Sequence, residues 1–428
     1  MDQSLPVKTD WGFAKKLFFR FGFLFFVTQI VFQPGNAPYD IINSNIHSPL
    51  ESITIWIGKH MLHIGYEINP DGNGSSDTTY DYLLVLLLVI LSIAGTIIWT
   101  LIDSKRKSYR NLNYWLVTIV RYYLAFSMFY YGFVKMFNIQ FPFPPPHILL
   151  QTYGNSSPMR LAWQFFGYSS AYNYFIGLAE IIGGALLLFK RTACAGALFC
   201  LVVSVNIMAV NYSFDVCVKL FSTLLVIMSL FLVWQDLKQL INFFWYNKIT
   251  QPANRMIPVF RNKRLARSLI AAKYILILFT LYQTITGDLD NIKKYGDHST
   301  YSPLYGIYDV KTFIKNNDTL LPVLTDTIMW RRLIVTSYDR ALVRSMNDNS
   351  RTFTITTDTV LKNFVLTSRT DTANKSNFAY TFIGNDSLQL HGKWKGDSVR
   401  VYLKKYDLRN FALVNRGFHF INETPYNR

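Results

Sequence analysis

The sequence predicts an α-helical polytopic membrane protein that ends in an antiparallel β domain, either a barrel or a sandwich. Seven stretches are apolar and long enough to cross a bilayer, which requires about 20 mostly apolar residues. The basic residues between these stretches fall almost entirely in alternate loops. After residue 286 the long apolar stretches stop, and short segments that alternate apolar and polar residues follow.

The composition also fits a membrane protein. Half of the 428 residues are hydrophobic and 16% are charged, whereas soluble domains usually carry about 25% charged residues. A net charge of +17 would suggest nucleic-acid binding in a soluble protein. We expect no nucleic acid here, because no recognised binding motif accompanies the charge and because cytoplasmic Lys and Arg face anionic lipid.

Hydropathy and length predict seven transmembrane helices, of which the first is the least certain. They cover residues 11–32, 82–102, 112–137, 171–189, 192–210, 216–234 and 268–285. Basic residues precede the uncharged core of the first stretch, as they do in a signal peptide. We interpret it as an uncleaved span, since no small-residue cleavage site follows it cleanly.

The distribution of basic residues predicts the orientation. Those on one side are Lys8, Lys15, Lys16, Lys105, Arg106, Lys107, Arg110, Lys190, Arg191, Lys238, Lys248, Arg255, Arg261, Lys263, Arg264 and Arg267. The alternate loops are poor in them: residues 33–81 contain only Lys59, and residues 138–170 only Arg160. The positive-inside rule then places the N-terminus in the cytoplasm of a bacterium and the C-terminal domain in the periplasm, with the spans in the inner membrane.

The region outside the spans predicts a β domain at residues 287–428. Strand candidates are residues 330–337, 352–357, 363–367, 378–382, 387–390, 398–403 and 411–414, whereas residues 303–315 have the pattern of a short docking helix. The remaining divisions are two N-terminal spans with an external loop (1–110), a four-helix bundle (111–245), and a cytoplasmic linker with the seventh span (246–286).

Two external loops carry local signals. Residues 50–66 have apolar residues at helical spacing and predict a helix on the outer membrane interface. His60 and His63 lie one turn apart there, but without a third ligand they predict no metal site. The run FPFPPP at residues 141–146 is stiff and cannot be helical, so we expect a rigid lip over the outer end of the bundle.

Ionisable and polar residues inside the spans are the candidate functional residues, because such groups are costly in hydrocarbon and are usually paired or functional. Near the cytoplasmic ends, Arg20 and Arg121 are expected to pair or to snorkel. In the external half, the candidates are Lys135, Glu180, Asn206, Asn211, Asp215 and Lys219. Short connections make spans four to six neighbours, so these side chains are expected to converge on one outward-facing polar pocket.

Glu180 lies near the middle of its span and needs a proton or a cation, for which Lys135 and Lys219 are the candidates. Two interpretations stay open. The residues could form a buried ion-pair network that fixes the register of the helices. Alternatively, they could bind an anionic headgroup or a quinone, or move a proton.

The C-terminal tail, RGFHFINETPYNR, is the second candidate site. It contains Arg416, His419 and Glu423. These residues could form a binding site. We favour the other interpretation, in which the tail is the last strand, closes the β domain and carries its charges at the rim.

Three motifs within residues 121–234 point to a known family. They are RYYLAFSMFYYGFVKMF, GLAEIIGGALLLFKRTACAGAL and NYSFDVCVKLFSTLLVIM. Together they resemble the DoxX-like membrane family, whose pattern is matched by Gly132 and Lys135, by Glu180, Gly183 and Gly184, and by the basic turn at residues 190–192. The GSSDTT loop and the tail around residues 417–419 are similar to a larger subgroup with extra helices and a C-terminal β domain.

The resemblance implies a four-helix membrane bundle and, as in some relatives, a subunit of a quinone-linked sulfur oxidoreductase or a partner of a redox enzyme. We therefore expect a non-catalytic membrane subunit that holds a protein partner, or a lipid- or quinone-like ligand, at the polar pocket. The alternative is a quinone- or thiol-linked oxidoreductase subunit that uses Glu180, Lys135 and Lys219.

No cofactor is expected from this chain. Haem and flavin motifs are absent, and the three cysteines, Cys194, Cys200 and Cys217, form no CxxC pair. Transport is less favoured, because the sequence shows no inverted repeat or broken helix pair. Whether any catalysis occurs, and with which ligand or oligomeric state, stays open at the level of sequence.

Overall fold

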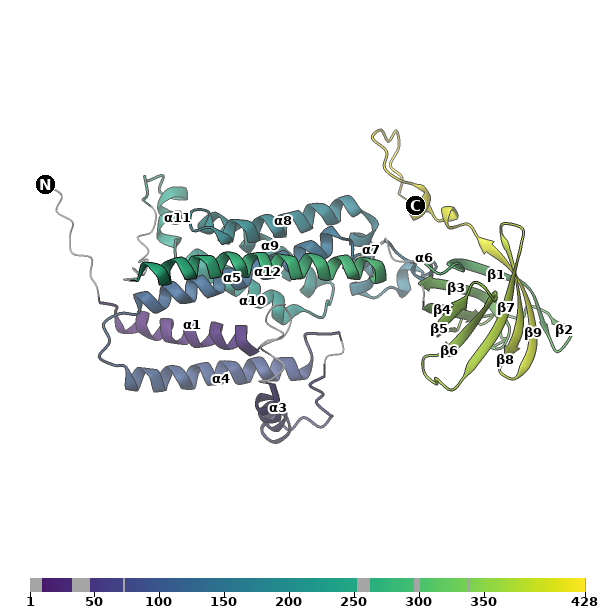
Figure 1. Cartoon of the computed structure of the whole chain (residues 1–428), viewed down its shortest axis with the longest axis horizontal. Coiled ribbons are helices and arrows are strands. Elements are labelled where there is room, and N and C mark those ends of the chain that lie inside the picture. The colour runs from purple at the N-terminus through teal and green to yellow at the C-terminus, as the bar shows by residue number, and fades with distance from the viewer. Residues whose placement is uncertain are drawn as a thin grey trace. The chain divides into compact units, whose positions relative to one another are not determined.

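The computed structural model describes residues 10–32, 47–71, 74–251, 262–295, 301–337 and 339–427. The chain divides into two compact units, whose elements are labelled in Figure 1. The helical unit comprises Met1–Gln140 and Ser170–Asp290. The β unit comprises Phe141–Ser169 and Asn291–Arg428, so it takes in the loop between two helices of the other unit.

Each of the seven apolar stretches overlaps a helix of the structure. The helices are α1 (Phe13–Phe32), α3 (His47–Trp56), α4 (Thr79–Ile102), α5 (Arg110–Met136), α8 (Ser170–Leu188), α9 (Ala193–Ser213), α10 (Lys219–Trp234), α11 (Leu237–Phe244) and α12 (Lys263–Tyr295). A π-helical turn, Ile57–Met61, follows α3, so the helix expected within residues 50–66 is confirmed.

Apolar helices indicate a membrane protein. By length and composition, four helices in the described part of the chain could cross a bilayer: α4, α8, α9 and α12. A fifth span results if α10 and α11 count as one, although they bend by 73° at the break between them. Helices α1 and α5 are long enough, but α1 carries three basic residues and α5 contains five tyrosines.

Glycines set the spacing of the central helices. A Cβ atom added to Gly177 of α8 would lie 2.7 Å from the carbonyl oxygen of Gly132 in α5. A Cβ atom added to Gly184 of α8 would lie 2.8 Å from the carbonyl oxygen of Ala125, which is also in α5. Helices α8 and α9 meet in the same way, since a Cβ atom on Gly196 would lie 2.8 Å from the Leu187 nitrogen. Small residues of this kind allow close backbone approach between membrane helices.

Arg20 is buried at one end of the helical unit, and it is paired, as expected. Its Nη2 donates to the Tyr109 hydroxyl at 2.7 Å and to the Asp103 carbonyl oxygen at 2.8 Å, and its Nη1 donates to the Thr100 hydroxyl at 2.9 Å. The Tyr109 hydroxyl in turn donates to the Asp103 carboxylate at 2.9 Å. This network joins α1, the end of α4 and the start of α5, so we assign Arg20 a structural role.

The β unit contains a closed antiparallel barrel. Its strands are β1 (Gly306–Lys315), β3 (Trp330–Ser337), β4 (Arg340–Ser345), β5 (Ser350–Asp358), β6 (Asn363–Ser368), β7 (Lys375–Ile383), β8 (Ser387–Trp394) and β9 (Asp397–Tyr406). Each strand pairs with the next in this order, and β9 returns to pair with β1, as Figure 1 shows. The short strand β2 (Asp318–Leu320) extends the edge of β1 beyond β3. The domain is therefore a barrel rather than a sandwich.

An aromatic cluster fills the barrel. Trp330 is fully buried, and its ring centroid lies 4.9 Å from that of Trp394 and 5.4 Å from that of Phe378. Phe364 stacks on Phe378 at 5.4 Å. Burial alternates along the strands, as in β7, where Phe378 and Tyr380 point inward. This alternation is the period-two pattern that predicted the strands.

Two sequence-based expectations for this domain are wrong. Residues 303–315 do not form a helix, because most of them form β1, in which Tyr308 and Phe313 belong to the barrel core. A bulge between Val310 and Thr312 interrupts the alternation and hid the strand pattern. Residues 411–414 are not a strand: a helical turn, α13 (Ala412–Asn415), lies there. The barrel closes by pairing β9 with β1, so the tail does not close it.

The loop between α5 and α8 belongs to the β unit. It contains α6 (Pro146–Leu149), a 3-10 turn (Tyr153–Asn155) and α7 (Pro158–Tyr168), and α6 packs against β1 and β3. Phe141 in the predicted lip packs its ring on Phe166 at 4.8 Å. The proline-rich run is therefore part of the packing of the β unit.

The stability of this loop is expected to depend on pH through His147. Burial, together with the positive charges of Arg340 and Arg160, lowers the pKa of His147 to about 4. The folded loop thus favours the neutral ring, whereas the unfolded chain takes up a proton below about pH 6.5. Between about pH 6.5 and 4 acidification should weaken the loop, by about 1–2 kcal/mol after discounting for partial exposure. Hydrogen exchange in residues 144–152, corrected for intrinsic rates, should accelerate in that window.

Replacing the ring tests the assignment. In His147→Gln the exchange of residues 144–152 should no longer change between pH 6.5 and 4 beyond the intrinsic effect. The same pH response in His147→Gln as in the unaltered chain would show that another group is responsible.

Candidate functional site

The central feature of the helical unit is a buried ion pair between α5 and α8. The Lys135 Nζ atom lies 2.9 Å from Oε1 and 3.1 Å from Oε2 of Glu180. The side chains are 8% and 2% exposed. The glycine contact between Gly132 and Gly177 brings the two helices close enough for this pair. The cation that Glu180 requires is therefore Lys135 and not Lys219.

The remaining hydrogen-bonding capacity of Lys135 is directed at its own helix. Its Nζ atom lies 3.4 Å from the Tyr131 carbonyl oxygen and 5.5 Å from the centre of the Tyr131 ring. Both carboxylate oxygens of Glu180 lie within 3.1 Å of the ammonium group. The two charges are thus compensated by each other.

Buried amides continue the polar contact between the same two helices. The Asn173 Nδ2 atom donates to Asn138 Oδ1 at 3.1 Å, and Asn138 Nδ2 donates to the Ser170 hydroxyl at 2.9 Å. Asn173 is fully buried. Sequence reasoning missed it, although it precedes Glu180 by seven residues, two helical turns, and therefore shares its face. Asn138 has a φ of 51°, a left-handed conformation that Asn tolerates, just after the end of α5.

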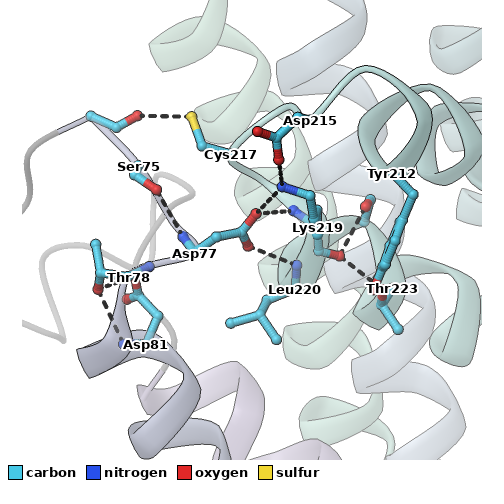
Figure 2. Close-up of polar contacts among 12 residues, drawn as sticks. Ser75, Asp77, Thr78, Asp81, Tyr212, Asp215, Cys217, Lys219, Leu220 and Thr223 are labelled. Carbon is cyan, nitrogen blue, oxygen red and sulfur yellow. Dashed lines mark hydrogen bonds and ion pairs between the residues drawn. The ribbon is translucent and has the colours of Figure 1, made fainter. Parts of the chain in front are cut away.

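Asp215 and Lys219 lie in a second cluster, at the start of α10 (Figure 2). The Lys219 Nζ atom lies 2.8 Å from the Asp215 carboxylate and 3.8 Å from that of Asp77. The Asp215 side chain is 82% exposed, whereas that of Asp77 is 7% exposed. Within the part of the chain that the structure describes, no hydrogen bond or ion pair joins this cluster to Lys135 or Glu180. The expected single pocket is thus two separate groups.

Asp77 organises the second cluster. Its carboxylate accepts hydrogen bonds from the backbone nitrogens of Lys219 at 2.7 Å and Leu220 at 2.9 Å, as Figure 2 shows. These nitrogens open α10 and have no partner within that helix, so a carboxylate from the loop before α4 caps it. Asp81 performs the same task for its own helix, since it forms a capping box with Thr78. The GSSDTT loop therefore fastens α4 to α10.

Removing this cap is expected to loosen α10. Asp77→Ala should lower the stability of the helical unit by about 1–2 kcal/mol, because two partly buried backbone donors lose a charged acceptor. Faster hydrogen exchange at Lys219 and Leu220 in the detergent-solubilised protein would measure the loss. The matched control is Asp215→Asn, which removes an exposed ion pair and should change little. Equal effects of the two substitutions would contradict the capping role.

The two predicted asparagines of α9 lie in different environments. Asn206 is exposed on the helix. Asn211 is buried, and its Nδ2 atom has no hydrogen-bond partner among the described residues. The Ser204 hydroxyl is also buried and, within the same described set, without a partner.

The packing of α8 on α9 sets the depth of Ser204. A Cβ atom on Gly183 would lie 2.8 Å from the Cys200 sulfur. Helices α8 and α9 are antiparallel. Glu180 lies one turn before Gly183 in α8, and Ser204 lies one turn after Cys200 in α9, so both lie on the same side of this contact. Ser204 is therefore at about the depth of the ion pair.

The tail residues do not converge on a site. His419 and Glu423 are exposed. Arg416 donates to the Asn422 side-chain oxygen and lies over the Tyr426 ring, 4.6 Å from its centre. The Asn422 side chain donates to the His419 carbonyl oxygen at 3.2 Å. Across the described residues of the chain, no group of three His, Cys, Asp or Glu side chains is placed to hold a metal ion.

Comparison with known proteins gives one relative. The chain is 40% identical over 124 residues to the uncharacterized protein YwoB of Bacillus subtilis (strain 168), and the match covers 29% of this chain and 79% of that protein. The chain belongs to the YwoB family. Because the Bacillus protein is described as uncharacterized, membership of the YwoB family assigns no activity to the ion pair. No family model matches the chain, and no solved structure matches it.

Proposed function

We propose that this chain is a DoxX-like, non-catalytic subunit of the bacterial inner membrane that holds a lipid- or quinone-like ligand or a protein partner. The observation that carries the proposal is the Lys135–Glu180 pair, which is buried and compensated within itself. A catalytic base or nucleophile must be reachable by its substrate. A buried pair whose partners satisfy each other instead suits a fixed scaffold, because it specifies which faces of α5 and α8 meet.

The membrane setting of the proposal has seven spans. The four helices that pass on composition are joined by α10, α1 and α5. The deeper charged groups of α1 and α5, Arg20, Arg121 and Lys135, are buried within the unit, whereas Lys15 and Lys16 lie in the first turn of α1. A helix that turns its charges inward can lie among other helices in lipid. With basic loops in the cytoplasm, the seven crossings would carry the β-barrel to the periplasm. A barrel there would present a rigid surface to a partner protein.

The alternative is a quinone- or thiol-linked oxidoreductase subunit. One observation favours a ligand along α9, between the depth of the ion pair at Ser204 and the end of the helix near Asn211. The Ser204 hydroxyl and the Asn211 Nδ2 atom are buried and have no hydrogen-bond partner among the described residues. Such groups usually have a partner, and a quinone carbonyl or a lipid ester oxygen could supply one. Lys219, assigned to this alternative by sequence, lies instead in the Asp77 cluster.

Native mass spectrometry of the purified full chain tests the proposal. Protein that leaves the membrane with a stoichiometric partner protein or a bound lipid, and without quinone, supports the scaffold function. Bound quinone that is lost in Ser204→Ala and Asn211→Leu, but retained in the exposed control Asn206→Ala, supports the oxidoreductase alternative. Protein that carries neither partner nor ligand in any of these forms would overturn both.

A further inference from the structure

The helix α11 has features that neither the ion pair nor the capping cluster explains. It follows α10 after the short turn at Gln235 and Asp236 and runs at 73° to it. Figure 1 shows α11 at one end of the helical unit, across the direction of α8 and α12. The turn is fixed: the Gln235 side chain donates to the Phe231 carbonyl oxygen at 3.3 Å and accepts from Asn113 of α5 at 3.4 Å.

The helical unit gives α11 little support. None of its eight residues is fully buried, and Leu240 is the residue that packs against the core of the bundle. An isolated helix of this length is not stable in water, since nucleation costs more than one or two turns recover. Among the described residues nothing else supports α11, so we look for a further surface that holds it.

The exposed side chains of α11 and the residues after it identify that surface. Phe243, Phe244, Trp245 and Tyr246 are all exposed, with Trp245 at 80%. Lys238 and Lys248 flank this aromatic row. In the sequence, residues 237–267 contain seven basic residues and no acidic one. Aromatic rings between basic residues suit the boundary between acyl chains and headgroups, and each Lys or Arg beside anionic lipid contributes about 1 kcal/mol.

We propose that α11 and residues 245–251 form a membrane-surface anchor that lies in the plane of the cytoplasmic leaflet and binds anionic lipid headgroups. The aromatic row enters the acyl boundary, and Lys238 and Lys248 contact the headgroups. A protein partner is the less suitable occupant, because the segment continues directly from α10, whose last residue, Trp234, is itself 71% exposed. This inference rests on the membrane setting of the proposed function and is independent of the Lys135–Glu180 pair.

Fluorescence quenching in liposomes tests the anchor. The variant Trp245→Cys, in a full-length background with Cys194→Ala, Cys200→Ala and Cys217→Ala, is labelled with an environment-sensitive dye. The protein is reconstituted in phosphatidylcholine with or without phosphatidylglycerol. We expect quenching by lipids that carry a shallow nitroxide, and iodide quenching about threefold weaker than at a labelled Val360, an exposed apolar residue of the β unit.

The charge contribution is measured with Lys238→Gln/Lys248→Gln. In liposomes with phosphatidylglycerol, the label at residue 245 should be less protected from iodide in this variant. In phosphatidylcholine alone, the protection should be the same with and without the two substitutions. Protection that is equal in both lipids and in both proteins would overturn the anionic-headgroup contact.

Two further outcomes overturn the inference, and a second labelled site separates them from a failure of the membrane setting. Iodide access at residue 245 equal to that at Val360 would show that no surface covers α11. Protection from iodide without quenching by lipid nitroxides would show a protein occupant. A label at Val202, exposed on α9, should be quenched by deep lipid nitroxides whenever the protein is embedded. Loss of that signal would overturn the proposed membrane setting itself.

Discussion

Replacing Lys135 with methionine is expected to destabilise the helical unit by about 3–5 kcal/mol. The substitution leaves the Glu180 carboxylate 2% exposed, without the ammonium group that now lies 2.9 Å away. Glu180 would then have to take up a proton or remain as an uncompensated buried charge, and both are unfavourable. Thermal unfolding of the detergent-solubilised full chain, followed by far-ultraviolet circular dichroism, would measure the loss.

The double variant Lys135→Met/Glu180→Leu is the matched control. It removes both charges and replaces them with apolar groups of similar size, so it should recover most of the stability lost in Lys135→Met. If the loss of stability in the double variant equalled the sum of the losses in Lys135→Met and Glu180→Leu, the two side chains would not interact. Full stability of Lys135→Met alone would show that Glu180 has another partner.

Substitution of Gly177 is expected to have the second large effect. An alanine there would place a carbon 2.7 Å from the Gly132 carbonyl oxygen and 3.1 Å from the Met136 backbone nitrogen. Because these are backbone atoms, the helices themselves must separate, at a cost of about 1–3 kcal/mol for Gly177→Ala. Gly177→Leu should prevent α5 and α8 from packing. Separation also lengthens the Lys135–Glu180 contact, so the effect should exceed that of overpacking alone.

Gly22 provides the comparison. It lies in α1, and an added Cβ atom would meet nothing within 4 Å. Gly22→Ala should therefore be neutral or stabilising by up to about 1 kcal/mol through helix propensity. Equal stability of Gly22→Ala and Gly177→Ala proteins in the same unfolding assay would contradict close packing of α5 on α8.

Much of the fold could be predicted because its signals are local. Each apolar stretch became a helix, and the strands at residues 363–367 and 378–382 followed from alternation within a few residues. The bulge in β1 and the helical turn α13 were not predictable in this way. A bulge removes the period-two signal of β1. That β9, and not residues 411–414, is the last strand becomes clear only from its pairing with β1. The strand β4 was also missed, since six residues give little periodicity.

The candidate site was predicted only in part. Length and charge identified Glu180 and Lys135, because a rare acid at mid-span needs a cation from a neighbouring helix. The choice of Lys135 as the partner of Glu180 depended on the direction of the Lys135 side chain, and the spacing of residues along the sequence does not predict that direction. The capping role of Asp77 was not predictable, because Asp77 contacts α10 across 142 residues of sequence. Asn206 is exposed on α9, so it does not take part in either polar cluster.

The return of β9 to β1 constrains when this domain can be made. Ile307 pairs with Tyr406, so the first and last strands meet across nearly the whole domain. Pairing of such distant strands is slow, because the chain between them loses conformational entropy before the strand contacts provide any stabilisation. A polypeptide stopped before Asp397 would leave β1 and β8 with unpaired edges, which invite association with other chains. The whole segment from β1 to β9 must therefore reach its compartment before the barrel can close, whichever side of the membrane it occupies.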